Sequence, residues 1–297
     1  MRLLITVNIV FLLCHSALAQ ADSLQRQINR LLVSKDATVG VAIYGPETND
    51  TLYINGSRHF PMQSVFKFHI ALAVLNAVDQ GRLSLDSLIS TKQADLILHT
   101  WSPMQERYHG GDIVLPLDSI IAYAVSQSDN NACDILLRLI GGPKAVQDFI
   151  RALGYKDVSI SATEADMHKA WNIQFKNWTT PGAAVQLLNR FASGKLLSKK
   201  STYYLFGIMA GTSTGQNRIK GQLPGGTTVA HKTGTSGTNE QGITAAVNDI
   251  GIVQLPGGKY FLVAIFVTNS KETLQANEQM IAGISRLAWD YFAGRKR

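Results

Sequence analysis

The stretch Val65-Phe-Lys-Phe-His-Ile-Ala-Leu-Ala-Val-Leu-Asn-Ala-Val78 is apolar around almost the whole circumference of a helix. A helix without a polar face is buried on all sides, so we expect this segment at the centre of the fold. Gly81 supplies the stop signal expected after it. The sequence keeps a helical period from about Phe60 to Gly207. Four further helices are expected, at Leu117–Val125, Asn131–Ile140, Ala145–Leu153 and Pro181–Phe191.

Strand patterns replace this period towards both ends of the chain. Two β-rich runs precede the helices and three follow them, at Thr38–Tyr44, Thr51–Ile54, Thr227–Thr233, Thr244–Gln254 and Tyr260–Thr268. Turn residues at 46–50 and 255–259 indicate hairpins. We predict a five-stranded antiparallel sheet with the amphipathic terminal helices, Ser23–Val33 and Gln275–Phe292, on one face.

This order of elements predicts a fold of the class α/β plus all-α. Residues 20–59 and 208–297 would form an α/β lobe, and residues 60–207 would form a large all-α lobe inserted into it. A seam between two lobes is a common place for an active site.

The first nineteen residues have the features of a signal peptide. Arg2 precedes an apolar run from Leu3 to Cys14, and Ala17-Leu-Ala19 is a typical cleavage site. The run is too short to span a bilayer comfortably, which disfavours a membrane anchor. A lipoprotein is the second alternative, although Cys14 does not follow a small residue. We expect a cleaved signal, a periplasmic or secreted protein, and no stable membrane association afterwards.

Composition narrows the classes of function. The formal net charge is +7, but the basic residues are scattered, which disfavours nucleic-acid binding. The histidines show no zinc-ligand spacing, so we expect no metal and no cofactor. Without Cys14, Cys133 has no partner for a disulfide, and its apolar neighbours predict a buried side chain. We expect a monomer that acts on small molecules.

Three short motifs carry the chemistry. Ser64-Val-Phe-Lys67 places a hydroxyl and an amine on one helix face, where the amine can reach the hydroxyl and take its proton. Such a pair arises by chance roughly once in a chain of this length. Ser128-Asp-Asn130 lies between two expected helices, and Lys232-Thr-Gly234 ends an expected strand. Because three different elements carry them, the motifs can converge on the seam.

The combination resembles class A β-lactamases, and penicillin-binding proteins share the three motifs. The resemblance covers the mature chain and looks closest to the PER/VEB-type extended-spectrum branch. It rests on the stretches Pro61–Lys67, Ser126–Asn130, Asn177–Thr179 and Val229–Gly237. It implies an all-α lobe packed on an α/β lobe, no metal, and β-lactam hydrolysis that gives antibiotic resistance.

Physical roles can be argued for each motif residue. Ser64 attacks the lactam carbonyl, and the backbone amides of Ser64 and Thr235 are candidate oxyanion donors. Ser128 passes a proton to the lactam nitrogen, while Lys232 polarises Ser128 and attracts the substrate carboxylate. That carboxylate would lie against Thr233, Gly234, Thr235 and Ser236. Asn130 either binds the substrate's amide or caps a helix.

The acyl-enzyme also needs a base that activates water. Glu164 is the candidate, and Asp166 is the rival. Either could instead be a surface carboxylate. The stretch from Ser161 to His168 shows no convincing period, so we expect a loop. The resemblance assigns deacylation to Glu164.

The sequence departs from the common class A pattern at several positions. His168 stands where an asparagine usually helps to hold the hydrolytic water, and Ala162 and Asn177 cannot form the usual Arg–Asp pair. We infer a differently folded loop and a roomier cleft that admits oxyimino-cephalosporins. Arg218 resembles the alternative guanidinium that some members use for the carboxylate, although it could be a surface arginine. Trp101 resembles the aromatic residue at the cleft mouth, or it is an ordinary core or surface residue.

Two competing functions remain open at this point. A penicillin-binding DD-peptidase shares the motifs but deacylates slowly, and Glu164 is the feature that disfavours it. A non-catalytic β-lactam sensor usually carries a membrane-spanning segment, and no such pattern follows residue 20.

Overall fold

The computed structural model describes residues 23–294. A five-stranded sheet in the order β2-β1-β10-β9-β8 lies at its centre, and each neighbouring pair is antiparallel. The strands are β1 (Thr38–Gly45), β2 (Asp50–Ile54), β8 (Val229–Thr235), β9 (Val247–Gln254) and β10 (Tyr260–Thr268). The prediction of one sheet built from both ends of the chain is confirmed.

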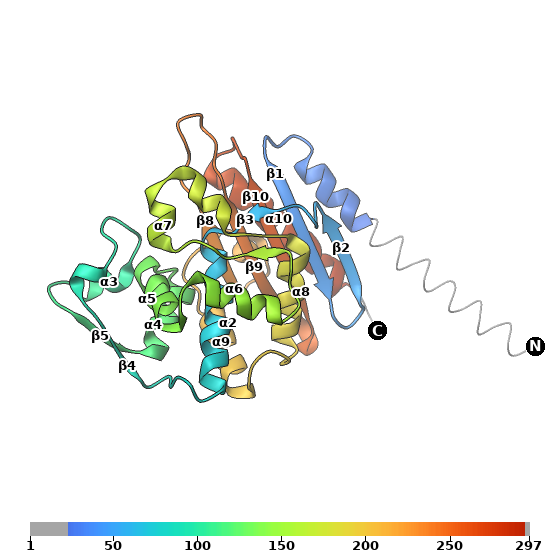
Figure 1. Cartoon of the computed structure of the whole chain (residues 1–297). Coiled ribbons are helices and arrows are strands. Elements are labelled where there is room, and N and C mark those ends of the chain that lie inside the picture. The colour runs from blue at the N-terminus through green and yellow to red at the C-terminus, as the bar shows by residue number, and fades with distance from the viewer. Residues whose placement is uncertain (1–22, 295–297) are drawn as a thin grey trace, which may run out of the picture.

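The terminal helices cover one face of this sheet, as predicted (Figure 1). The first helix spans residues 23–32, and α10 spans Leu274–Ala293. Leu24 and Ile28 of the first helix share a buried cluster with Ile281 and Ile284 of α10 and with Val263 of β10. Residues two apart on a strand point to the same face, which explains why alternate residues of the strands belong to this cluster.

The helical middle of the chain packs on the other face. The central helix is α2 (Phe66–Asp79), and it is buried along almost its whole length. Around it lie α4 (Leu117–Ser126), α5 (Asn130–Ile140), α6 (Pro143–Ala152), α8 (Pro181–Ala192) and α9 (Lys199–Ala210). Phe68 and Leu72 of α2 belong to the same buried cluster as Ala264 and Phe266 of β10. One continuous core therefore joins the helices to the sheet. The residue limits of the two lobes stay a prediction.

Several elements differ from the expectations. Two small sheets interrupt the helical region, formed by β3 (Phe60–Pro61) with β7 (Trp178–Thr179) and β6 (Val158–Ser159), and by β4 (Leu88–Thr91) with β5 (Ile113–Pro116). Helices α3 (Pro103–Arg107) and α9 were not predicted either. The loop expected around Glu164 is wrong, because Glu164–Lys169 forms helix α7. Periodicity misses α7 because it has fewer than two turns.

The structure also bears on the predictions for Cys133 and for membrane association. Cys133 is fully buried and free, as its apolar neighbours predicted. No helix in the described part of the chain is both long and apolar enough to cross a membrane. The predicted signal peptide lies outside the described residues.

Candidate active site

Ser64 lies in a single 3-10 turn, η1 (Gln63–Val65), directly before α2. The residue before it, Gln63, has a φ of 46°, which is unusual for a residue with a side chain. The edge of β8 packs tightly against this turn. A Cβ on Gly234 would lie 2.3 Å from the carbonyl oxygen of Met62, so only glycine allows this approach. The close contact brings the end of β8 beside Ser64.

The Lys67 amine stands at the centre of the site and is fully buried. It donates to the carbonyl oxygen of Ser128 at 2.8 Å and to Oδ1 of Asn130 at 2.6 Å. It also lies 3.0 Å from Oε1 of Glu164. Among the described hydrogen bonds none joins Lys67 to the Ser64 hydroxyl. The amine is therefore held by Ser128, Asn130 and Glu164, and the expected proton transfer from Ser64 stays a prediction.

Ser128 and Lys232 meet across the seam. Nζ of Lys232 donates to Oγ of Ser128 at 2.9 Å and to the carbonyl oxygen of Thr233, also at 2.9 Å. Ser128 adopts a positive φ of 59° in the link between α4 and α5. Burial lowers the pKa of Lys232 well below its usual value, and the positive charge of Lys67 lowers it further. Two buried amines, those of Lys67 and Lys232, thus both donate to Ser128.

The motif residue Asn130 faces this cluster and does not cap the helix. Asp129 is the N-cap of α5, because its carboxylate accepts from the amide of Ala132 at 2.8 Å. Nδ2 of Asn130 donates to Oγ1 of Thr100 at 2.7 Å, which leaves its Oδ1 for Lys67. The capping interpretation of Asn130 is therefore wrong.

Glu164 begins helix α7, and its side chain is only 9% exposed. The carboxylate of Asp134, which sequence reasoning missed, accepts from the amide of Glu164 at 2.8 Å and from that of Ala165 at 2.9 Å. Burial raises the pKa of Asp134 to about 6, against the effect of these two hydrogen bonds. Its signal in the sequence is an acidic residue on the buried face of α5.

Asp166, the rival base, points elsewhere. It forms a capping box with Thr163 and a salt bridge of 2.8 Å with Lys169. The hydrogen bond from Lys169 is the main reason that its pKa lies below the usual value. A carboxylate that caps its own helix and pairs with a surface lysine is not free to reach Lys67.

Arg218 is 4% exposed, so the surface-arginine interpretation is wrong. Its guanidinium donates to the carbonyl oxygens of Gly234 at 3.1 Å and Asn248 at 3.0 Å, and to Oγ1 of Thr235 at 2.7 Å. Nε lies 3.2 Å from a carboxylate oxygen of Glu278 on α10. The guanidinium thus adds positive charge beside the exposed end of β8, where Thr235 lies.

A cleft of about 570 Å³ borders this cluster at Glu164 and Asn130. Glu164 and Asn130 line it from the helical side, Thr235 and Ser236 line it from the strand, and His168 lines it from α7. Trp101 is 57% exposed and donates from its indole N–H to the carbonyl oxygen of Gln127 at 2.8 Å. Its carbonyl oxygen accepts from the amide of Asn130. Trp101 is therefore an exposed aromatic residue close to the cleft, and the core interpretation is wrong.

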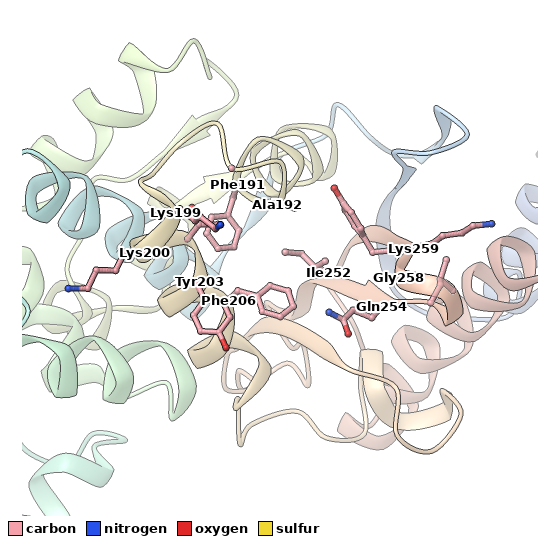
Figure 2. Close-up of a pocket in the computed structure, with 14 residues that line it drawn as sticks. Phe191, Ala192, Lys199, Lys200, Tyr203, Phe206, Ile252, Gln254, Gly258 and Lys259 are labelled. Carbon is pink, nitrogen blue, oxygen red and sulfur yellow. The ribbon is translucent and has the colours of Figure 1, made fainter.

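Cavity size alone does not identify this site. A larger cavity of about 1050 Å³ lies between α8, α9 and the hairpin of β9 and β10. Figure 2 shows aromatic side chains such as Phe206 and Tyr203 in it, with Lys200 and Lys259 extending outward. None of the three motifs contributes a residue there. Within residues 23–294 no group of three or more His, Cys, Asp or Glu residues could hold a metal ion.

Asn177 braces the segment before α7. Its Oδ1 accepts from the amides of Ser161 at 2.8 Å and Ala162 at 3.0 Å, and its Nδ2 donates to the carbonyl oxygen of Ala162 at 2.9 Å. The amide side chain thus makes hydrogen bonds at the position where the sequence lacks an ion pair.

Comparison with known proteins identifies the family of this chain. The model of the β-lactamase enzyme family matches residues 23–292. The chain belongs to the class A β-lactamases. Beta-lactamase VEB-1 of Pseudomonas aeruginosa is 48% identical over 295 residues, which cover 99% of this chain and 98% of that protein. Extended-spectrum beta-lactamase PER-1 of the same species is 44% identical over 273 residues, 92% of this chain and 88% of that one.

Solved structures of class A β-lactamases share the fold. The crystal structure of the TLA-3 extended-spectrum beta-lactamase is 50% identical and matches with a TM-score of 0.90, covering 92% of this chain and 99% of that chain. A class A β-lactamase from Bacteroides cellulosilyticus is 40% identical with a TM-score of 0.89. The chain is therefore a β-lactamase that hydrolyses β-lactams, and the resemblance inferred from the motifs is confirmed.

Proposed function

We propose that this β-lactamase works through a covalent ester on Ser64, which Glu164 then helps to hydrolyse. The observation that carries the proposal is the position of the Lys67 amine, 3.0 Å from Glu164 and one helical turn from Ser64. A single buried amine can then exchange protons with the group that forms the ester and with the group that breaks it.

Acylation begins with a proton transfer. The neutral Lys67 amine, after giving a proton to Glu164, takes the proton of the Ser64 hydroxyl while Oγ bonds to the lactam carbonyl carbon. The carbonyl oxygen becomes an oxyanion, and we assign the backbone amides of Ser64 and Thr235 as its donors. The close packing of η1 on β8 supports this assignment.

The lactam C–N bond breaks as the carbonyl re-forms. Ser128 gives its hydroxyl proton to the departing nitrogen and regains a proton from Lys67. Lys232, 2.9 Å from Oγ of Ser128, stabilises the alkoxide that develops there. The ring is then open, and the acyl group remains on Ser64.

Deacylation uses the Glu164 carboxylate after it has returned its proton to Lys67. The carboxylate takes one proton from a water molecule, and the resulting hydroxide attacks the ester carbon. The Ser64 oxygen leaves and regains its proton, so the enzyme is unchanged after one turnover. The hydrogen bonds between Asp134 and the start of α7 favour a fixed Glu164.

Substrate recognition is assigned to the other residues of the cleft. Thr233, Thr235 and Ser236, beside Gly234, would bind the substrate carboxylate with the help of Arg218. Asn130 would bind the side-chain amide. Trp101 and His168 would border the acyl side chain. We infer that penicillins and cephalosporins are substrates, including oxyimino-cephalosporins. We also infer export to the periplasm or medium after signal cleavage, and a monomeric enzyme without a cofactor.

The deciding experiment replaces Glu164 by alanine. We expect Glu164→Ala to accumulate an acyl-enzyme, visible by mass spectrometry as the protein mass plus one intact β-lactam. Asp166→Asn is the matched control, because it removes the rival carboxylate but keeps an oxygen for the capping box of α7, and it should turn over without accumulation. Ser64→Ala should form no covalent adduct. Normal turnover by Glu164→Ala would assign the base elsewhere. A single stoichiometric burst of nitrocefin hydrolysis by the unchanged enzyme would instead indicate slow deacylation, as in a penicillin-binding protein.

A further inference from the structure

A buried pair of a carboxylate and an imidazole joins strands β8 and β9. Nδ1 of His231 on β8 is 2.9 and 3.0 Å from the two carboxylate oxygens of Asp249 on β9, and neither side chain is exposed. Neighbouring strand residues point to opposite faces, so His231 points away from the face that carries Lys232. The mechanism above uses neither residue of this pair.

The Asp249 carboxylate has a second partner, which leads to Arg218. Its Oδ2 accepts from the backbone amide of Ile219 at 3.2 Å. Ile219 begins the 3-10 helix η4 (Ile219–Gln222), and Arg218 before it has a non-helical backbone with φ −91° and ψ −119°. The first amide of a helix has no acceptor within that helix. Asp249 supplies the acceptor from the neighbouring strand.

The packing around the pair confirms that these segments meet. A Cβ on Gly251, opposite His231 in the sheet, would lie 2.9 Å from Cβ of His231 and 3.3 Å from Cδ1 of Ile219. Thr212, at the start of the segment that leads to Arg218, donates to the carbonyl oxygen of His231 at 2.8 Å. Asp249 thus holds the segment at the point from which the Arg218 side chain starts.

Burying a carboxylate such as that of Asp249 costs free energy unless hydrogen bonds and positive charges compensate its loss of contact with water. The three hydrogen bonds above provide part of the compensation. The amines of Lys220 and Lys232 also lie close enough for Asp249 to oppose the lowering of their pKa by burial. A buried charge that must be compensated in several ways fixes one arrangement of its partners more strictly than an apolar residue would.

We propose that Asp249 is a positioning residue for Arg218, acting through the amide of Ile219 to hold the guanidinium against Thr235. The inference rests on the carboxylate-binding role proposed above for Arg218. Glu278 holds the same guanidinium from α10, so the side chain is fixed at its charged end by one acid and at its backbone end by another.

A double-mutant cycle tests this role. Arg218→Ala, Asp249→Ala and the double variant are compared with the unchanged enzyme by steady-state kinetics on a penicillin. We expect Asp249→Ala to raise KM about tenfold, the effect of losing one charge-assisted hydrogen bond, and to change kcat less than threefold. In the Arg218→Ala background it should raise KM no further. Asp249→Asn should restore KM to within threefold, because its Oδ1 can still accept from Ile219.

The outcomes separate the two proposals. If Arg218→Ala leaves KM unchanged, the carboxylate-binding role of Arg218 fails, and this inference fails with it. If Arg218→Ala raises KM but Asp249→Ala does not, the positioning role alone is refuted. Equal effects of Asp249→Ala in both backgrounds would also refute it. Melting temperatures identify a variant that fails to fold, and Asp249→Ser, with its shorter side chain, then replaces Asp249→Ala in the cycle.

Discussion

The carboxylate of Asp134 accepts hydrogen bonds from the first two backbone amides of helix α7, those of Glu164 and Ala165, at 2.8 and 2.9 Å. This contact joins the helix that carries the proposed hydrolytic base to helix α5, which also carries Asn130. Because α5 packs on the central helix α2, the base and the Ser64–Lys67 pair share one rigid frame.

Removing this contact should slow deacylation more than acylation. Asp134→Ala leaves two amides without a buried acceptor, so α7 should shift and Glu164 should lose its place. We expect kcat to fall about tenfold or more, since hydrogen bonds to charged groups contribute about 1.5–3 kcal/mol each. Stopped-flow mass spectrometry should show acyl-enzyme in the steady state. Asp148→Ala, which removes an exposed carboxylate paired with Lys144, is the control and should change neither step. Equal turnover by both variants would contradict the idea.

Asn177 should stabilise the segment before α7. Asn177→Ala leaves the amides of Ser161 and Ala162 and one carbonyl oxygen without their buried partner. The free energy of unfolding should fall by about 2–4 kcal/mol. Asn177→Asp keeps the hydrogen-bond acceptor and loses the donor, so its free energy of unfolding should lie between those of the unchanged enzyme and Asn177→Ala. Urea denaturation measures the change, and a loss below 0.5 kcal/mol for Asn177→Ala, within the usual range for surface substitutions, would show that the segment is held by other contacts.

His69 should make the enzyme sensitive to acid. It is buried in α2, and burial lowers its pKa from 6.5 to about 4. The neutral ring is therefore favoured in the folded state. Its contribution to stability is complete above pH 6.5 and is lost as the pH falls towards 4. Between pH 7.5 and pH 5 the loss should be about 2 kcal/mol.

The matched variant is His69→Leu, which cannot be protonated. Its own stability at pH 7.5 can differ in either direction, but its loss between pH 7.5 and pH 5 should be smaller by that amount. Denaturant unfolding of both proteins at the two pH values gives the comparison. Identical pH slopes would mean that the His69 ring is accessible to protons in the folded state.

The enzyme should hydrolyse oxyimino-cephalosporins in addition to penicillins. Helix α7 and the end of β8 border the cleft of about 570 Å³. Ala162 and Asn177 cannot form the Arg–Asp ion pair that usually holds the segment around the glutamate in class A β-lactamases. Steady-state kinetics on a penicillin, an oxyimino-cephalosporin and a carbapenem measure the range. Turnover of the penicillin alone would contradict a roomier cleft.

Local patterns in the sequence were enough to predict the five strands of the main sheet, the central helix and the three motifs. These follow from local patterns: a period of two in the strands, an apolar circumference around α2, and short fixed spacings such as Ser64 to Lys67. Such signals need no knowledge of which segments meet, so they could be read before the fold was known. The short elements α7, β3 and β6 were missed because they contain too few residues to show a period.

The contacts among the motif residues could not be predicted before the packing of the elements was known. That packing places Lys67 between Ser128, Asn130 and Glu164, buries Arg218 behind β8, and turns Asp166 towards Lys169. The packing also brings Asp134, Asn177 and Asp249 to backbone amides that lie 15 to 31 residues away in sequence. Those contacts depend on how whole elements pack, and the hydrogen-bonding needs of helix starts and buried charges become visible only when the neighbouring elements are in place.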